Sequence, residues 1–250
     1  MSAPDVRAFT VGPVQENAYI VRADAAAELA VLVDPGDEAE RLLDAAESLG
    51  VRIEAILITH CHFDHIGAVA PVARATGAPV YCPEIERVLL SDIMSWVPPG
   101  FGPFEGYEPE HTVAGGERLS LAGLDIEVVF TPGHSPGHVT YAIAPSAPPD
   151  RLASTDDSAG ASGGGSRPVL LSGDVLFQGS VGRVDLPGGD WPTLERSIGA
   201  LLRAFPPETI VYPGHMGVTS LGRERDTNPF LSELRVRVPR TSAVPGAAPA

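Results

Sequence analysis

An apolar segment from Ile53 to Ile58 leads directly into the heptapeptide Thr59-His60-Cys61-His62-Phe63-Asp64-His65. The apolar segment has the length and composition of a buried β-strand. The heptapeptide places four potential metal ligands within six residues. Histidine and aspartate are costly to bury unless they are paired or coordinated. A chain with this junction therefore needs a fold that holds a polar site at the end of a buried strand.

The spacing inside the heptapeptide separates its ligands into two groups. In an extended loop His60 and His62 point to the same side, because they are two residues apart. They can share one ion, and Asp64 and His65 then face a second ion beyond the turn. Imidazole nitrogen and carboxylate oxygen suit Zn²⁺ or a similar divalent ion. The competing interpretation is that Asp64 is the N-cap of a helix starting at Ile66, with surface histidines around it.

Three other predicted strands are followed by residues of the same types. Loops at strand ends are where an α/β scaffold gathers residues that are distant in sequence. Five of the seven histidines fall into this set, and His111 and His138 do not. The three motifs are Thr131-Pro132-Gly133-His134-Ser135-Pro136-Gly137-His138, Ser172-Gly173-Asp174 and Tyr212-Pro213-Gly214-His215.

The rest of the chain alternates short apolar strands with helices that have one apolar face. Strands clustered in two halves, with helices between them, predict an α/β protein with a four-layer αββα sandwich, and a doubly wound sheet is the alternative. Strands are expected at Val6–Val11, Ala18–Arg22, Ala30–Asp34, Ile53–Ile58, Pro79–Tyr81, Arg118–Leu121, Asp125–Phe130, Val139–Ala144, Val169–Ser172 and Thr209–Tyr212. Helices are expected at Asp37–Leu49, Ile66–Ala75, Glu84–Ser91 and Trp191–Ala204.

The chain has 250 residues, 44% of them hydrophobic, and is expected to form one domain over residues 1–239. The segment from Pro145 to Pro168 is rich in Ser, Gly and Asp, which predicts a flexible insertion. Residues 240–250 are expected to form a disordered tail. The aromatic residues between Asp92 and Thr112 sit among Pro and Gly, so that segment is either a lid over the site or a loop packed on the core.

The net charge of −15 disfavours nucleic acid and anionic membranes as partners. No segment has the features of a signal peptide or a membrane span. Cys61 and Cys82 are the only cysteines, too few for a disulfide framework. The expectation is a cytoplasmic protein, monomeric or homodimeric, that acts on a small molecule.

Taken in order, the motifs HxHxDH, TPGHSPGH, SGD and PGH resemble those of the metallo-β-lactamase superfamily. The run from Leu176 to Asp190 resembles that of its compact glyoxalase II-like members. The similarity extends from about Val6 to Leu231, apart from the segment between Pro145 and Pro168. It implies two bound divalent metal ions, with zinc as the expected metal and iron or manganese as alternatives.

The resemblance also implies how the ligands are shared. His138, the second histidine of its motif, is expected behind the ligands or in the core. Asp34, in the turn Val-Asp-Pro-Gly, would either support a ligand by hydrogen bonding or fix that turn. The first ion would be bound by His60, His62 and His134. The second ion would be bound by Asp64, His65 and His215, and Asp174 would bridge the two ions.

The activity implied by the resemblance is hydrolysis of a thioester, such as S-lactoylglutathione, with a metal-bridging hydroxide as the nucleophile. Asp64 and Asp174 would act in catalysis by orienting the water, although metal ligands are poor general bases. Arg183 stands where related enzymes carry a basic thiol-binding residue. It could pair with a substrate carboxylate or form a structural salt bridge to Asp185 or Asp190.

Other activities remain open at this point. Only 35 residues follow His215, too few for the helical domain that contacts glutathione in long-form glyoxalase II, and Met216-Gly217 replaces Glu-Tyr. The resemblance therefore does not extend to the residues that give glutathione specificity. The alternatives are a persulfide dioxygenase with one iron held by two histidines and an aspartate, and a lactonase or β-lactamase. The negative net charge argues against a nuclease, and the complete ligand set argues against a non-catalytic binding protein.

Overall fold

The computed structural model describes residues 3–146 and 168–232, whose strands form two six-stranded sheets and one two-stranded sheet. The first six-stranded sheet has the order β1-β2-β3-β4-β5-β6, and the second has the order β14-β13-β10-β9-β8-β7. The first contains β1 (Asp5–Val11), β2 (Glu16–Arg22), β3 (Leu29–Val33), β4 (Arg52–Leu57), β5 (Val80–Pro83) and β6 (His111–Val113). The second contains β7 (Arg118–Leu121), β8 (Leu124–Phe130), β9 (Val139–Pro145), β10 (Val169–Gly173), β13 (Ile210–Pro213) and β14 (Thr219–Ser220). The small sheet pairs β11 (Leu176–Phe177) with β12 (Ser180–Val181).

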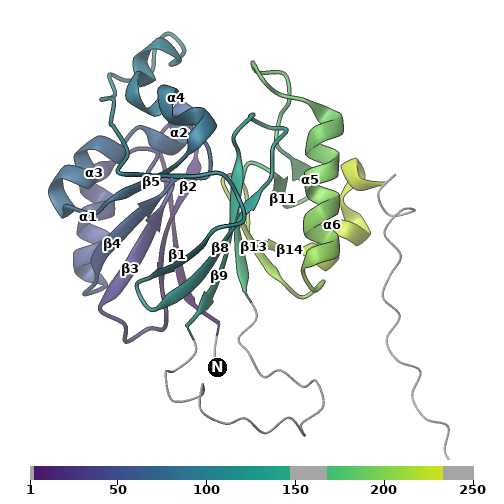
Figure 1. Cartoon of the computed structure of the whole chain (residues 1–250), viewed down its shortest axis with the longest axis horizontal. Helices are drawn as coiled ribbons and strands as arrows, with labels where there is room; N and C mark the ends of the chain where they lie inside the picture. Colours follow the sequence, from purple (N-terminus) through teal and green to yellow (C-terminus); the bar gives the residue numbers. More distant parts are fainter. Residues whose placement is uncertain (1–2, 147–167, 233–250) are drawn as a thin grey trace, which may run out of the picture.

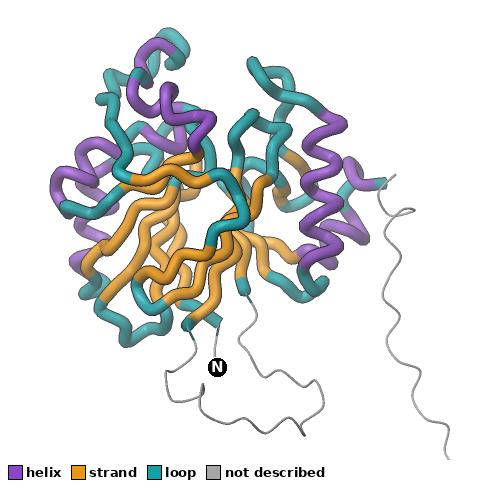
Figure 2. The backbone as a smooth tube through the Cα atoms, viewed as in Figure 1, coloured by secondary structure: helices purple, strands orange, loops and turns teal. Residues whose placement is uncertain are grey.

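Helices cover the outer face of each large sheet, and the two sheets lie between them (Figures 1 and 2). On the first sheet these are mainly α1 (Ala39–Ser48) and α3 (Val69–Thr76), preceded by the short α2 (Phe63–Ile66). On the second they are α5 (Trp191–Ala204) and α6 (Leu221–Thr227). The remaining helical segments are η1 (Glu84–Glu86), α4 (Arg87–Ser91), η2 (Ile93–Ser95) and η4 (Pro229–Leu231).

Three large apolar clusters, and a small fourth one around Leu42 of α1, fill the spaces between these four layers. Along β3, Leu32 packs toward the outer helices, whereas Val31 and Val33 pack between the sheets, because successive side chains of a strand point to opposite faces. The third cluster joins the second sheet to α5 through Leu170 and Ile198. Strands buried on both faces read as continuous apolar runs in the sequence. The predicted αββα sandwich is confirmed.

Strand directions bring several loop starts to the same edge. Strands β3, β4, β5 and β6 run parallel, so their carboxyl ends lie together. In the second sheet, β8 and β10 are both antiparallel to β9, and β13 is parallel to β10. The carboxyl ends of β8, β10 and β13 therefore also lie together. The polar motifs of the sequence all follow strands of these two sets.

Two of the predicted helices are divided in the structure, and the first division has an identifiable cause. The helix predicted at Ile66–Ala75 is divided into α2 and α3, because the Ala68 amide donates to the carbonyl of Pro35 (3.0 Å) instead of continuing a helix. Helix α2 begins at Phe63 with His62 as its N-cap, so Asp64 is not an N-cap. The helix predicted at Glu84–Ser91 consists of η1 and α4.

The segment from Asp92 to Thr112 is not a loop throughout, because its last two residues begin β6. This strand has only three residues, too few for a period of two to appear in the sequence, and it forms by pairing with β5. Within the segment, the ring centroids of Phe101 and Phe104 lie 4.8 and 6.2 Å from that of Phe63. These aromatic residues therefore pack beside α2, as the packed-loop alternative requires.

The predicted tail at residues 240–250 lies outside the described residues, and so does the predicted insertion at 145–168 except for its two ends. Those parts of the domain prediction, and the single domain over residues 1–239, stay predictions. Within residues 3–146 and 168–232, no helix is both long enough and apolar enough to cross a bilayer.

Candidate metal centre

The loops that follow β4, β8, β10 and β13 meet at one place, at the edge of the sandwich where these strands end. Each carries one of the polar motifs recognised in the sequence, and the strand directions described above explain why they converge. The side chains brought together are His60, His62, Asp64, His65, His134, Asp174 and His215.

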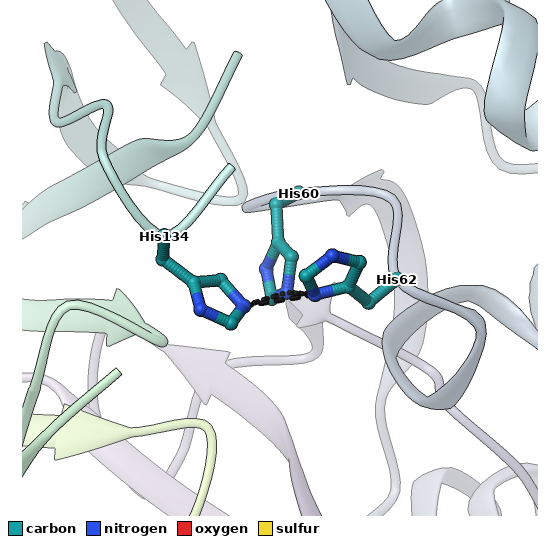
Figure 3. A group of neighbouring side chains, drawn as sticks. All are labelled: His60, His62 and His134. Carbon is teal, nitrogen blue, oxygen red and sulfur yellow. Dashed lines mark hydrogen bonds between the residues drawn. The ribbon is translucent and has the colours of Figure 1, made fainter. Parts of the chain in front are cut away.

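Three histidines form the first cluster, with their rings directed toward a common point (Figure 3). His60 Nε2 lies 3.1 Å from His62 Nδ1 and 3.2 Å from His134 Nε2. His62 Nδ1 lies 2.8 Å from His134 Nε2. Nitrogens bound about 2.0–2.1 Å from one tetrahedral Zn²⁺ would be about 3.3 Å apart. The three nitrogens therefore fit one such ion with a fourth position left for water or substrate.

Asp64, His65 and His215 form a second cluster, whose ligand atoms all lie within 4.8 Å of one another. His215 Nε2 is 3.3 Å and His65 Nε2 is 3.9 Å from Asp64 Oδ2. Among the described residues His65 Nε2 has no hydrogen-bond partner, although it is buried. A buried polar atom without a partner is destabilising, and a cation at this position would remove that penalty.

The Asp174 carboxylate lies between the two clusters. Its Oδ2 is 3.5 Å from His134 Nε2 of the first cluster and 3.6 Å from His215 Nε2 of the second. Its Oδ1 is 3.4 Å from His65 Nε2 and has no hydrogen-bond partner among the described residues. This is the placement that a carboxylate shared by two ions requires.

Glycines allow this close approach of loops. Gly173 has a positive φ of 46°, and a Cβ there would lie 2.7 Å from the Nε2 of His138. A Cβ on Gly214 would collide with the Asp174 carboxylate and would lie 2.6 Å from Cε1 of His65. The glycines of the SGD and PGH motifs are therefore needed where the ligands converge.

Hydrogen bonds at Nδ1 orient three of the histidines. His65 Nδ1 contacts Asp34 Oδ2 (3.0 Å), His134 Nδ1 contacts the Arg183 carbonyl (2.7 Å), and His215 Nδ1 contacts the Gln15 carbonyl (3.2 Å). An acceptor at Nδ1 places the proton there and leaves Nε2 free to bind a cation.

Asp34 has the supporting role considered from the sequence. Besides contacting His65, it accepts hydrogen bonds from the amide (2.7 Å) and hydroxyl (2.6 Å) of Thr59. It therefore links the carboxyl end of β3 to the loop that follows β4.

His138 lies behind the first cluster, as its position in the motif predicts. Its Nε2 accepts a hydrogen bond from the Asp174 amide (3.1 Å), so its proton is on Nδ1, which contacts the Thr131 hydroxyl (3.0 Å). The ring stacks on that of His60 with centroids 4.9 Å apart. Burial lowers the pKa of His138 well below its ordinary value, so the ring is neutral at physiological pH.

The two clusters have opposite electrostatic character. Burial, reinforced by neighbouring histidines, lowers the pKa of His60 well below its ordinary value and that of His62 to about 4. Burial also opposes the charge of His65 and His215, but nearby carboxylates outweigh it. The pKa values of both histidines are therefore raised, mainly by Asp174 for His65 and mainly by Asp64 for His215.

Two residues of the site, both at the start of β2, were not predicted from the sequence. Glu16 is fully buried, lies 3.7 Å from His65 Nδ1, and has no hydrogen-bond partner among the described residues. Burial raises its pKa well above the ordinary value. Asn17 donates from its side chain to the carbonyls of Pro213 (3.2 Å) and Met216 (3.0 Å), on either side of His215. The available signal was a pair of polar residues opening an apolar strand.

Arg183 forms the salt bridge considered from the sequence. Its guanidinium makes two hydrogen bonds to Asp185, at 2.7 and 2.8 Å, and both side chains are exposed. Its carbonyl contacts His134, which places the residue at the edge of the first cluster. The role of Arg183 in substrate binding stays a prediction.

Comparison with known proteins identifies relatives over most of the chain. A family model described as "Metallo-beta-lactamase superfamily" matches residues 11–144 and 155–215. The chain is 30% identical over 231 residues to the hydroxyacylglutathione hydrolase GloC of Haemophilus influenzae. The alignment covers 91% of this chain and 98% of GloC.

Two solved structures are similar over comparable lengths. BLEG-1, a B3 metallo-β-lactamase, has a TM-score of 0.76 and 37% identity, and covers 91% of this chain and 100% of its own. TTHA1623 in a di-iron-bound form has a TM-score of 0.71 and 40% identity, and covers 90% of this chain and 100% of its own.

Proposed function

The chain belongs to the metallo-β-lactamase superfamily, and we propose that it is a binuclear metallohydrolase that cleaves the thioester of a small acyl-thiol. The observation that carries the proposal is the pair of ligand clusters with Asp174 between them. His60, His62 and His134 would hold one ion, and Asp64, His65 and His215 the other. Zinc is the expected metal, and the di-iron form of TTHA1623 supports iron as the alternative.

Divalent ions bound in such clusters supply a hydroxide nucleophile at neutral pH and polarise a carbonyl group. The protein side chains supply orientation. Asp174 Oδ2 lies between the clusters, near His134 Nε2 and His215 Nε2, and Asp64 Oδ2 lies in the second cluster, 3.3 Å from His215 Nε2. They can accept hydrogen bonds from a water there and direct its lone pair toward the substrate carbonyl. No serine or cysteine nucleophile is needed in this arrangement.

The proposed substrate class is supported by the likeness to GloC, a hydroxyacylglutathione hydrolase. Arg183 offers a cation at the edge of the first cluster. Its ion pair with Asp185 is exposed at both ends, and water and salt weaken pairs of this kind. A carboxylate on the thiol part of the substrate can therefore replace Asp185 at little cost.

A substrate panel tests the proposal. The purified protein, loaded with Zn²⁺, is assayed with S-lactoylglutathione, an acyl-thiol lacking glutathione, a lactone and a β-lactam, and oxygen uptake is measured with a persulfide on iron-loaded protein. We expect a thioester to have the highest kcat/KM. The likeness to BLEG-1 makes the β-lactam the second candidate. Preferred cleavage of the lactone or β-lactam, or oxygen uptake with the persulfide, would reject the thioester assignment.

A further inference from the structure

Glu86, at the end of η1, is a buried carboxylate that none of the metal-ligand assignments uses. Its side chain is almost fully buried, with 1% exposure. Oε2 accepts a hydrogen bond from the amide of Cys61 (2.6 Å). Oε1 accepts from the amide of Gly137 (2.8 Å) and from the hydroxyl of Ser135. Each carboxylate oxygen therefore serves a different loop.

These two loops carry the whole of the first cluster. Cys61 lies between His60 and His62, and Ser135 directly follows His134. The first loop follows β4 of one sheet and the second follows β8 of the other. A single side chain thus links ligand loops from opposite sheets. The donors Cys61 and Ser135 are next to a ligand in the sequence, and Gly137 is three residues after His134.

We propose that Glu86 is a positioning residue that sets the separation of these loops and thereby the metal affinity of the three-histidine cluster. The inference rests on the proposed function only in that this cluster binds a metal ion. Its ring nitrogens lie 2.8–3.2 Å apart across the two loops. A change of loop separation therefore alters the distances between ligands directly.

A carboxylate is suited to this position for a chemical reason. All three partners of Glu86 are donors, so two acceptor oxygens are required. An amide has one oxygen and one NH₂ group, so glutamine would direct a donor at one of the two loops. Glu86→Gln therefore keeps the volume of the side chain and breaks one attachment.

The second cluster is held by other groups. Asp34 orients His65, and Asn17 contacts the chain on both sides of His215. None of these contacts involves Glu86. Substitution of Glu86 should therefore weaken the binding of the ion at the first cluster and leave the binding of the ion at the second cluster unchanged.

Glu224 offers a matched control. It is a fully buried glutamate in α6 that accepts hydrogen bonds from Gly179 N (2.8 Å), Asn228 Nδ2 (2.9 Å) and the Thr219 hydroxyl. Like Glu86 it accepts hydrogen bonds from two N–H groups and one hydroxyl, although one of the N–H groups belongs to a side-chain amide, and none of these donors lies beside a histidine of the first cluster. Glu224→Gln should change stability without a selective effect on that cluster.

The test is a Zn²⁺ titration of the metal-free full chain against a chromophoric chelator, with the melting temperature of each metal-free variant measured in parallel. We expect Glu86→Gln to weaken one of two ions about 10–100-fold, the range for residues that orient ligands. In a His215→Ala background the ion that remains should be the weakened one. Ser135→Ala removes one of the three donors to Glu86 and should give a smaller loss of metal affinity at the first cluster. This variant keeps the test decisive if Glu86→Gln does not fold.

Two results would overturn the inference. The first is wild-type affinity for both ions in Glu86→Gln and Ser135→Ala. The second is an equal loss at both sites that Glu224→Gln reproduces, because this indicates general destabilisation. Wild-type protein that binds two ions but cleaves no thioester would reject the substrate assignment alone, and the effect of Glu86 on affinity would still be measured.

Discussion

The two ligand clusters share the same loop after β4 but differ in chemistry. The first consists of three imidazoles, and burial keeps His60 and His62 neutral. The second contains carboxylates, whose negative charge outweighs burial and raises the pKa of His65 and His215. Burial therefore decides protonation only where it outweighs the attraction of nearby carboxylates. His60 and His62 can therefore bind an ion without losing protons, whereas His65 and His215 must release them.

Metal removal should have the largest effect on both clusters. We expect the purified protein to hold about two divalent ions per chain and to lose all hydrolytic activity after chelation, because no other nucleophile is assigned. Because the two clusters differ in their ligands, they should release their ions at two different chelator concentrations. Metal analysis during dialysis, with activity measured in parallel, checks this. Full activity of metal-free protein would exclude the metallohydrolase assignment.

Substitution of the two histidines of the TPGHSPGH motif tests where the first cluster ends. His134→Ala removes a ligand and should lower kcat by orders of magnitude and reduce metal content. His138→Gln removes no ligand but a ring that contacts the Asp174 amide and the Thr131 hydroxyl and stacks on His60, so the variant should retain both ions and lose about 10–100-fold or less in kcat. Steady-state kinetics and metal analysis of both variants are the measurements. The reverse order of effects would move the third ligand to His138.

Lowering the pH should separate the clusters in a metal titration. At the second cluster the histidine pKa values are raised, so a bound proton competes with the metal, and affinity should fall about tenfold for each pH unit below the pKa. At the first cluster His62 has a pKa of about 4 and stays neutral far below pH 7. Calorimetric titration at about pH 7 and about pH 5.5 should show one ion weakened and one nearly unchanged. Equal weakening of both would contradict the electrostatic difference.

Replacement of Asp150 to Ser166 with a short linker should have the smallest effect. This segment connects the end of β9 to the start of β10, which is the edge opposite the carboxyl ends of β8, β10 and β13. It also has little apolar surface to bury. Turnover, metal affinity at both clusters and melting temperature should stay close to wild type. A large change in any of them would show that the segment contacts the rest of the protein.

Local patterns predicted the sandwich, with a doubly wound sheet as the alternative, and placed the ligand motifs at strand ends. Strands buried on both faces appear as apolar runs, and each ligand motif follows such a run directly. Helix α5 was predicted with its observed bounds, because its start signal is local: Asp190 accepts a hydrogen bond from the Thr193 amide (2.9 Å). Neighbouring residues carry all the information in these cases.

Contacts between distant residues could not be predicted in this way. Glu86 is 25 residues from Cys61 and 51 from Gly137, and Asn17 is 196 residues from Pro213. Strand β6 exists only through its pairing with β5, and the break between α2 and α3 depends on the Pro35 carbonyl. The sequence does not distinguish a buried glutamate or asparagine from an exposed one, because the role of such a residue depends on which hydrogen-bonding partners the folded chain brings to it. The ligand motifs were therefore visible in the sequence, and their resemblance to a known family implied the ligand set, whereas the groups that orient the ligands were set by the packing of the two sheets.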